Sequence, residues 1–253
     1  MYMRMLIFLE VCMEKRNSLR HYFSRGEIFL WSISMAFIIS SFVLFDRAGY
    51  LKLIASVIGV TSLLLNAKGN PIGQVLMIIF SILYGVTAFT FAYYGEMLTY
   101  LGMTAPMAVV ALISWLRNPF HGNRMEVKVN CLKQKEVIVM FALTAGVTTV
   151  FYRILDVLGT ANLIFSTLSV TTSFLAVYLT FRRSAYFALV YAANDTILIV
   201  LWTMASLSEL SYLSVMICFA AFFINDIYGY ISWKKMWLRQ QGAGREAFCP
   251  DRN

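Results

Sequence analysis

Long apolar segments recur along almost the whole chain, separated by short polar turns. A helix needs roughly 20 mostly apolar residues to cross the hydrocarbon core of a bilayer. Only 13% of the 253 residues are charged, whereas a typical soluble domain has about 25%. The chain is therefore predicted to be an all-α membrane protein with eight transmembrane helices. These are expected at 28–45, 51–67, 75–93, 97–116, 137–154, 162–180, 185–206 and 211–231.

The basic residues predict an orientation. If the N-terminal tail (1–27) is cytoplasmic, all but three of the 21 Lys and Arg residues fall on the cytoplasmic side. Cytoplasmic loops of membrane proteins are enriched in these residues. We therefore expect a multi-pass protein of the cell membrane, embedded in the lipid bilayer, with both termini cytoplasmic, the C-terminal tail being 234–253. The net charge of +8 has the same explanation, and nucleic acid is not an expected partner because no basic stripe is interleaved with exposed aromatic residues.

Similar short sequences recur in the same order in the two halves of the chain. The three matches are VTSLLLNAKG (60–69) with VTTSFLAVYL (170–179), YGEMLTYLGM (94–103) with LSELSYLSVM (207–216), and LISWLR (112–117) with YISWKK (230–235). They predict two three-helix units with the same orientation, which enclose a substrate path with its site near the membrane midplane. The expected order is an extra helix (28–45), a first unit (51–116), a cytoplasmic loop (117–135), a linker helix (136–155) and a second unit (162–233).

Two Asn–Asp pairs interrupt the last two apolar segments, Asn194–Asp195 and Asn225–Asp226. An ionised Asp near the middle of a membrane helix costs about 2.5–3.5 kcal/mol and normally faces the interior of the bundle. Tyr191, Asp195, Leu198 and Trp202 follow helical spacing and share one face. These polar residues either line a substrate path or hydrogen bond to neighbouring helices as packing contacts. Asp226 has a further structural alternative, an ion pair with Arg182 or Arg183.

Other candidates lie near the helix ends. Glu96 and Glu209 are expected at equivalent turns on the outer side, where they either attract a cation to an outer mouth or cap a helix N-terminus. Trp115 and Trp233 precede basic residues, which is typical of side chains at the membrane–water interface.

The sequence carries no recognisable catalytic or metal-binding motif. The sequence has no GxSxG, HExxH or Walker motif, so an enzyme is not expected. Its four Cys residues lack CxxC spacing and are expected to be reduced thiols. We expect no cofactor and no metal.

Several segments resemble the PnuC family, whose members are related to the SWEET sugar transporters. The segments are AKGNPIGQ, YYGEMLTYL, LISWLRNP, YAANDTILIVLW and INDIYGYISW. They match in place and order over 51–235. The resemblance implies a 3 + 1 + 3 core of parallel repeats, with 28–45 as an added helix. It also implies that the chain takes up nicotinamide riboside, a precursor of NAD, by facilitated diffusion, with cytoplasmic phosphorylation then trapping it.

The resemblance also implies site residues. Asn194 and Asn225 match family asparagines, while Phe187 and Val190 stand where the family often has tryptophan. Phe80 and Ala108 replace family positions that are often asparagine and glutamine. The substrate-binding residues expected from all these observations are Tyr84, Phe187, Tyr191, Asn194, Asp195, Trp202 and Asn225.

The proposed site chemistry suits a flat organic cation, because aromatic faces and one carboxylate attract a pyridinium ring. Another vitamin or nucleoside, such as thiamine or a deoxynucleoside, is an alternative substrate. A membrane scaffold or sensor without transport is an alternative of another class. Assembly of the chain into a homo-oligomer is a further possibility that the sequence leaves open.

Overall fold

The computed structural model describes residues 22–47, 49–90, 94–160 and 162–246. Within them, eight helical segments are long and apolar enough to cross a membrane, which confirms the predicted number. The segments are α2 (Arg25–Phe45), α3 (Tyr50–Ala67), α4 (Ile72–Thr90), the run from α5 to α6 (Tyr94–Leu116), α7 (Gln134–Val157), α8 (Leu163–Phe181), α9 (Phe187–Ser206) and the last span, which runs through η2 (Leu210–Tyr212) into α10 (Leu213–Glu246).

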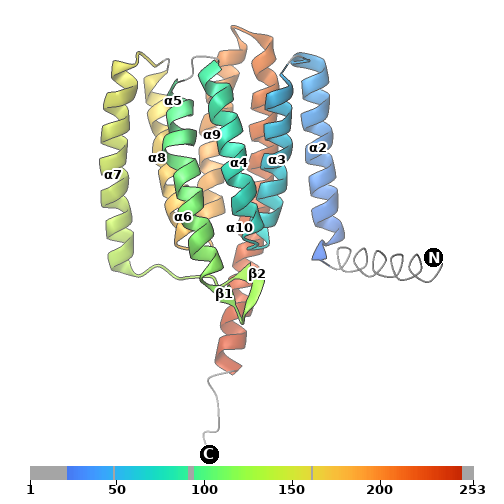
Figure 1. Cartoon of the computed structure of the whole chain (residues 1–253), viewed down its shortest axis with the longest axis vertical. Coiled ribbons are helices and arrows are strands. Elements are labelled where there is room, and N and C mark those ends of the chain that lie inside the picture. Colours follow the sequence, from blue (N-terminus) through green and yellow to red (C-terminus); the bar gives the residue numbers. More distant parts are fainter. Residues whose placement is uncertain (1–21, 48, 91–93, 161, 247–253) are drawn as a thin grey trace, which may run out of the picture.

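The core helices pack in a closed ring that follows their order in the sequence. The successive neighbours are α3, α4, α6, α8, α9 and α10, and α10 returns to α3. Helix α7 packs on α8, and α2 packs on α3 and α10, so these two helices lie outside the ring at opposite edges of the molecule (Figure 1). The ring interior is therefore enclosed by the two predicted three-helix units.

The fourth span is not a uniform α-helix. It begins as α5 (Tyr94–Met97), widens into the π-helix η1 (Leu98–Thr104) and continues as α6 (Ala105–Leu116). The N–H of Ala105 donates to the carbonyl of Tyr100, five residues back. Pro106 follows at the start of α6 and has no N–H for the ordinary helical bond to the preceding turn. Widened turns of this kind are frequent at functional sites.

The prediction that the last helix ends near 231 was wrong. Helix α10 runs on to Glu246, well beyond the body of the bundle (Figure 1). The loop 117–135 also has structure that was not predicted, since β1 (Pro119–Phe120) and β2 (Asn123–Val127) form an antiparallel hairpin. Side chains of the α10 extension hydrogen bond to this hairpin, which explains why a polar helix persists there.

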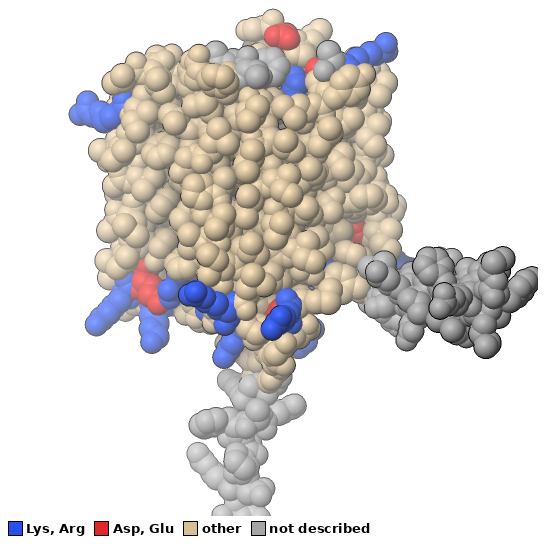
Figure 2. Space-filling view, in the orientation of Figure 1, with Lys and Arg blue, Asp and Glu red and all other residues tan. Residues whose placement is uncertain are grey.

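Charged side chains gather at the two ends of the molecule, with a broad and largely uncharged belt between them (Figure 2), and many large hydrophobic side chains of the spans are exposed. We call one end the basic end. It carries the α3–α4 turn (68–71), the loop 117–133, the α8–α9 turn (182–186) and the α10 extension. The other end, the opposite end, carries Arg47, Lys52 and Arg153. The belt is what a bilayer would cover.

The extra helix α2 is anchored to the ring by polar contacts. Buried Glu27 accepts hydrogen bonds from Lys68 Nζ at 3.0 Å and from the Tyr228 hydroxyl at 2.8 Å. Higher on the same helix, Ser34 Oγ accepts a bond from Asn225 Nδ2 at 2.9 Å. Helix α2 is thus part of the packed structure.

Candidate functional site

Two buried carboxyl groups meet inside the ring. Asp195 of α9 is 3% exposed and Asp226 of α10 is 4% exposed, and their carboxyl groups lie within hydrogen-bonding reach of each other. Among the described residues neither forms an ion pair. We call these residues the acid pair. The alternative that Asp226 pairs with Arg182 or Arg183 is not seen among the described residues, and Arg182 pairs with Glu136 of α7 instead.

An aromatic cluster lies beside the acid pair, towards the opposite end. It consists of Tyr84 of α4, Tyr100 of η1 and Trp202 of α9, all buried. The ring centroids of Tyr84 and Tyr100 are 4.4 Å apart, and those of Tyr84 and Trp202 are 6.5 Å apart. Tyr100 is close enough to Asp195 for the two groups to interact electrostatically. The predicted residues Tyr84 and Trp202 are therefore neighbours, and Tyr100 of the widened helix η1, which was not predicted, lies between this cluster and Asp195.

Two further predicted aromatic residues lie towards the basic end. Tyr191 is near both carboxyl groups of the acid pair. Its ring is 6.2 Å from that of Phe187, one α-helical turn earlier on α9. Phe187 in turn packs on Trp233, with centroids 4.8 Å apart. Phe187 thus packs on Tyr191 and Trp233, and Tyr191 lies between it and the acid pair.

The two asparagines face different neighbours. Asn194 Oδ1 accepts hydrogen bonds from Thr172 (2.8 Å) and Ser173 (3.1 Å) of α8. Asn225 donates to Ser34 of α2, while its buried Oδ1 has no hydrogen-bond partner among the described residues. Both amides therefore contribute to helix packing, and a substrate role for either stays a prediction.

The two glutamates of the predicted outer mouth differ sharply. Glu96 is only 3% exposed and lines a cavity of about 150 Å³ at the opposite end, between α5, α8 and α9. Glu209 is exposed and accepts a hydrogen bond from Ser211 at 2.6 Å, next to the short helix η2. Glu96 thus lies over the ring interior, whereas Glu209 has the local contacts of a surface turn.

The prediction that Trp115 and Trp233 lie at the membrane interface was wrong. Both side chains are 0% exposed, and their ring centroids are 5.3 Å apart between the helices near the basic end, so neither faces lipid. Each indole N–H donates to a main-chain carbonyl of a helix in the other unit. The repeated ISW sequence was the available signal for this shared role.

The positions that depart from the family pattern are inside the bundle. Phe80 packs on Tyr84, Tyr100 and Phe222, with ring centroids 5.4–5.8 Å apart. Ala108 is buried, and Val190 packs beside the Trp115 and Trp233 cluster. These substitutions replace polar or larger groups with apolar side chains inside the bundle.

In the described part of the chain, no group of three His, Cys, Asp or Glu side chains could hold a metal ion.

A closed ring of membrane-spanning helices around a polar and aromatic interior defines a polytopic helical membrane protein. Residues 49–235 match the sequence profile of the family described as Nicotinamide mononucleotide transporter. Because this match covers most of the chain, the chain belongs to that family. Helix α2 precedes the matched region.

Two individual proteins are similar to this chain. A protein of Neisseria mucosa named Nicotinamide riboside transporter PnuC is 26% identical over 217 residues, which are 84% of this chain and 82% of the relative. The crystal structure of the Vitamin B3 transporter PnuC has a TM-score of 0.75 and 23% sequence identity, and the similarity covers 86% of this chain and 94% of that one. The structural match establishes the fold.

Proposed function

We propose that this protein carries nicotinamide riboside, a nucleoside with a pyridinium cation, across the membrane by facilitated diffusion. Membership of a transporter family supports transport, and the relative named for nicotinamide riboside supports the substrate. The observation that carries the proposal is the acid pair beside the aromatic cluster. No catalysed reaction is part of it.

The charge of the site argues for a cationic substrate. Two carboxyl groups at hydrogen-bonding distance can share one proton and still carry one negative charge. Such a charge inside a membrane protein needs a partner, and among the described residues no Lys or Arg pairs with it. A pyridinium ring would supply the partner and could also stack on Tyr100 or Trp202, where cation–π contacts contribute roughly 0.5–2 kcal/mol.

The same charge argues against the phosphorylated nucleotide. Nicotinamide mononucleotide adds a phosphate that carries about −1.5 to −2 charges at neutral pH. That phosphate would be repelled by the acid pair and by buried Glu96 on the way to it. We therefore infer that the riboside is preferred over the mononucleotide.

The direction of transport follows from the distribution of charge. Because cytoplasmic loops are rich in Lys and Arg, we infer that the basic end and both termini are cytoplasmic, and that substrate enters from the opposite end. The cavity beside Glu96 holds about 150 Å³, whereas ligand pockets typically hold about 300–1,000 Å³. A nucleoside therefore requires the helices around this cavity to move apart.

Thiamine is a second candidate, because it is also a flat organic cation and suits the same acid pair and aromatic cluster. Deoxynucleosides are neutral and would gain nothing from the charge.

A binding screen on the purified protein tests the proposal. Nicotinamide riboside at 100 times its dissociation constant should stabilise the protein by about 2.7 kcal/mol, with weaker effects of its uncharged reduced form and of the mononucleotide. Thiamine added as a competitor decides between the two cations. A larger shift with the mononucleotide than with the riboside would contradict the proposal.

A further inference from the structure

At the basic end, the last helix of the first unit holds the first helix of the second unit. Ser114 Oγ and Trp115 Nε1 of α6 donate to the carbonyls of Phe181 and Thr180, each at 2.9 Å. These carbonyls lie in the last turn of α8, where helix carbonyls have no intrahelical partner. The contact therefore closes the α6–α8 seam of the ring.

The α10–α3 seam is closed by an equivalent contact, in which the second unit donates to the first. Ser232 Oγ and Trp233 Nε1 of α10 donate to the carbonyls of Ala67 and Asn66 at the end of α3, each at 2.7 Å. The two units are thus joined reciprocally at the basic end. This reciprocity supports the predicted equivalence of the units.

A segment of the connecting loop bridges the same two places. After α3 and α8 the chain makes similar turns, in which Gly69 and Arg183 both have positive φ angles, 68° and 57°. The carbonyl of Gly69 accepts a bond from Val127 N, and the carbonyl of Arg183 accepts one from Asn130 N, both at 3.0 Å. We call residues 126–131 the strap. It bonds to one turn of each unit, so the turns cannot separate while both bonds hold.

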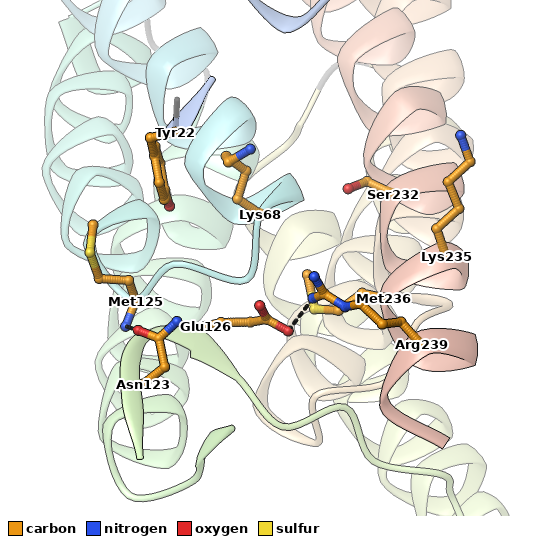
Figure 3. Close-up of a pocket in the computed structure, with 9 residues that line it drawn as sticks. All are labelled: Tyr22, Lys68, Asn123, Met125, Glu126, Ser232, Lys235, Met236 and Arg239. Atoms are coloured by element: carbon orange, nitrogen blue, oxygen red, sulfur yellow. Dashed lines mark hydrogen bonds and ion pairs between the residues drawn. The ribbon is translucent and has the colours of Figure 1, made fainter. Parts of the chain in front are cut away.

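The strap is held in place by the α10 extension, chiefly by Gln240. The side-chain oxygen Oε1 of Gln240 accepts a hydrogen bond from Val129 N at 2.8 Å. Its amide nitrogen donates to Glu126 Oε1 at 2.9 Å and to the Val127 carbonyl at 3.1 Å. Glu126 also pairs with Arg239 (Figure 3). One side chain thus makes three of the bonds that position the strap.

One side of the strap packs on the bundle, where buried Val127 and half-buried Val129 contact the Trp115 and Trp233 cluster. A cavity of about 370 Å³ lies beside it, between Met125 and Glu126 on the hairpin and Lys68 and Ser232 on α3–α4 and α10 (Figure 3). The strap is therefore held by apolar packing on one side and by the hydrogen bonds of Gln240 on the side that borders the cavity.

We propose that the strap is a latch on the path, and that it must leave at least one of the two turns before the path opens at the basic end. Gln240 is the positioning residue that sets how often it leaves. The inference rests on the proposed transport, since a latch matters only if the path opens. It assigns a conformational role to the connecting loop and to the helix that extends beyond the membrane.

The latch is tested with a cysteine reporter on the buried face of the strap itself. Val127 is fully buried and contributes its main-chain N–H, so Val127→Cys keeps that bond, and Ser replaces Cys12, Cys131 and Cys249. Labelling of the reporter by a thiol reagent is compared in Gln240→Ala and in the matched control Gln241→Ala, whose side chain is exposed. Loss of three hydrogen bonds should speed labelling at least about tenfold in Gln240→Ala and leave the control unchanged.

The comparison of labelling rates needs no substrate. Equal labelling rates in the two variants overturn the latch, and hydrogen exchange of the 126–131 amides in the unsubstituted chain gives the same comparison should the reporter fail to fold. Faster labelling in Gln240→Ala without a change in nicotinamide riboside flux in proteoliposomes also overturns it. If no variant, the parent chain included, transports the riboside, the proposed function fails, whereas the labelling result stands by itself.

Discussion

At the scale of single residues, the sequence predicted Asp195 better than it predicted its neighbours. A carboxylate in the middle of an apolar segment has few stable environments, so an interior position followed from its energy alone. That Asp226 lies against it depends on how α9 and α10 are aligned, which no local pattern in either helix contains. Tyr100 was missed because it lies in the π-helix η1, whose wider turns do not follow the α-helical spacing used to assign helix faces.

Two substitutions, Asp195→Asn and Asn194→Ala, test whether Asp195 binds the substrate through its charge. Asp195→Asn keeps the shape and removes the charge, so binding of nicotinamide riboside should weaken roughly ten- to hundredfold, since bonds to charged groups contribute about 1.5–3 kcal/mol. The uncharged reduced riboside should lose much less. Asn194→Ala should weaken both ligands alike. Titration calorimetry of the two ligands on each variant measures this, and equal losses in Asp195→Asn would make Asp195 a packing residue.

Trp233 offers a test of the contact between the units. Trp233→Phe removes the N–H that bonds to the Asn66 carbonyl, so the free energy of unfolding should fall by about 0.5–1.5 kcal/mol, plus a smaller loss of packing. Trp237→Phe on the same helix is the control, because its N–H bonds to Cys131 Sγ at the surface. Denaturation in detergent compares the two, and a larger effect in Trp237→Phe would argue against a structural role for the seam.

At the scale of elements, hydrophobic segments predicted the number and order of the membrane helices, and α2, α3, α7, α8 and α9 begin and end within three residues of expectation. The hairpin and the α10 extension were missed because both are polar and stabilise each other. Periodicity detects an element that buries an apolar face, whereas these two are held by side chains such as Gln240 that are far from their partners in sequence.

The anchoring of α2 gives a prediction at this scale. Glu27→Ala removes the carboxylate that bonds to Lys68 and Tyr228 and leaves a partly buried ammonium group without its partner. Loss of one partner of a buried pair costs about 3–5 kcal/mol, and partial solvation of Lys68 should reduce this to about 2 kcal/mol. The exposed Glu209→Ala should change stability by less than about 0.5 kcal/mol. Similar melting temperatures for the two variants would mean that α2 is not anchored by Glu27.

At the scale of the whole molecule, the sequence predicted a membrane bundle with most of its Lys and Arg residues on one side, and more of these side chains lie at the basic end than at the opposite end (Figure 2). The ring could not be predicted, because the order of helices around it depends on which faces pack. The parallel repeat was inferred from three short matches, and the reciprocal Ser–Trp contacts now support it.

The orientation of the molecule is tested by labelling in intact cells. Glu209→Cys at the opposite end should react with a membrane-impermeant thiol reagent, because that turn is expected outside the cell. Asn123→Cys in the hairpin should react only after the cells are permeabilised. Labelling of Asn123→Cys in intact cells would reverse the proposed orientation.

The claim that this protein carries a cationic nucleoside without a coupled ion is tested most directly by uptake into proteoliposomes under a potassium diffusion potential. A uniported cation gains about 2.3 kcal/mol per 100 mV. An inside-negative potential of about 100 mV should therefore concentrate nicotinamide riboside roughly fiftyfold, while the uncharged reduced riboside should only equilibrate. The account would be contradicted if uptake did not change with the membrane potential, or if it required an imposed proton gradient.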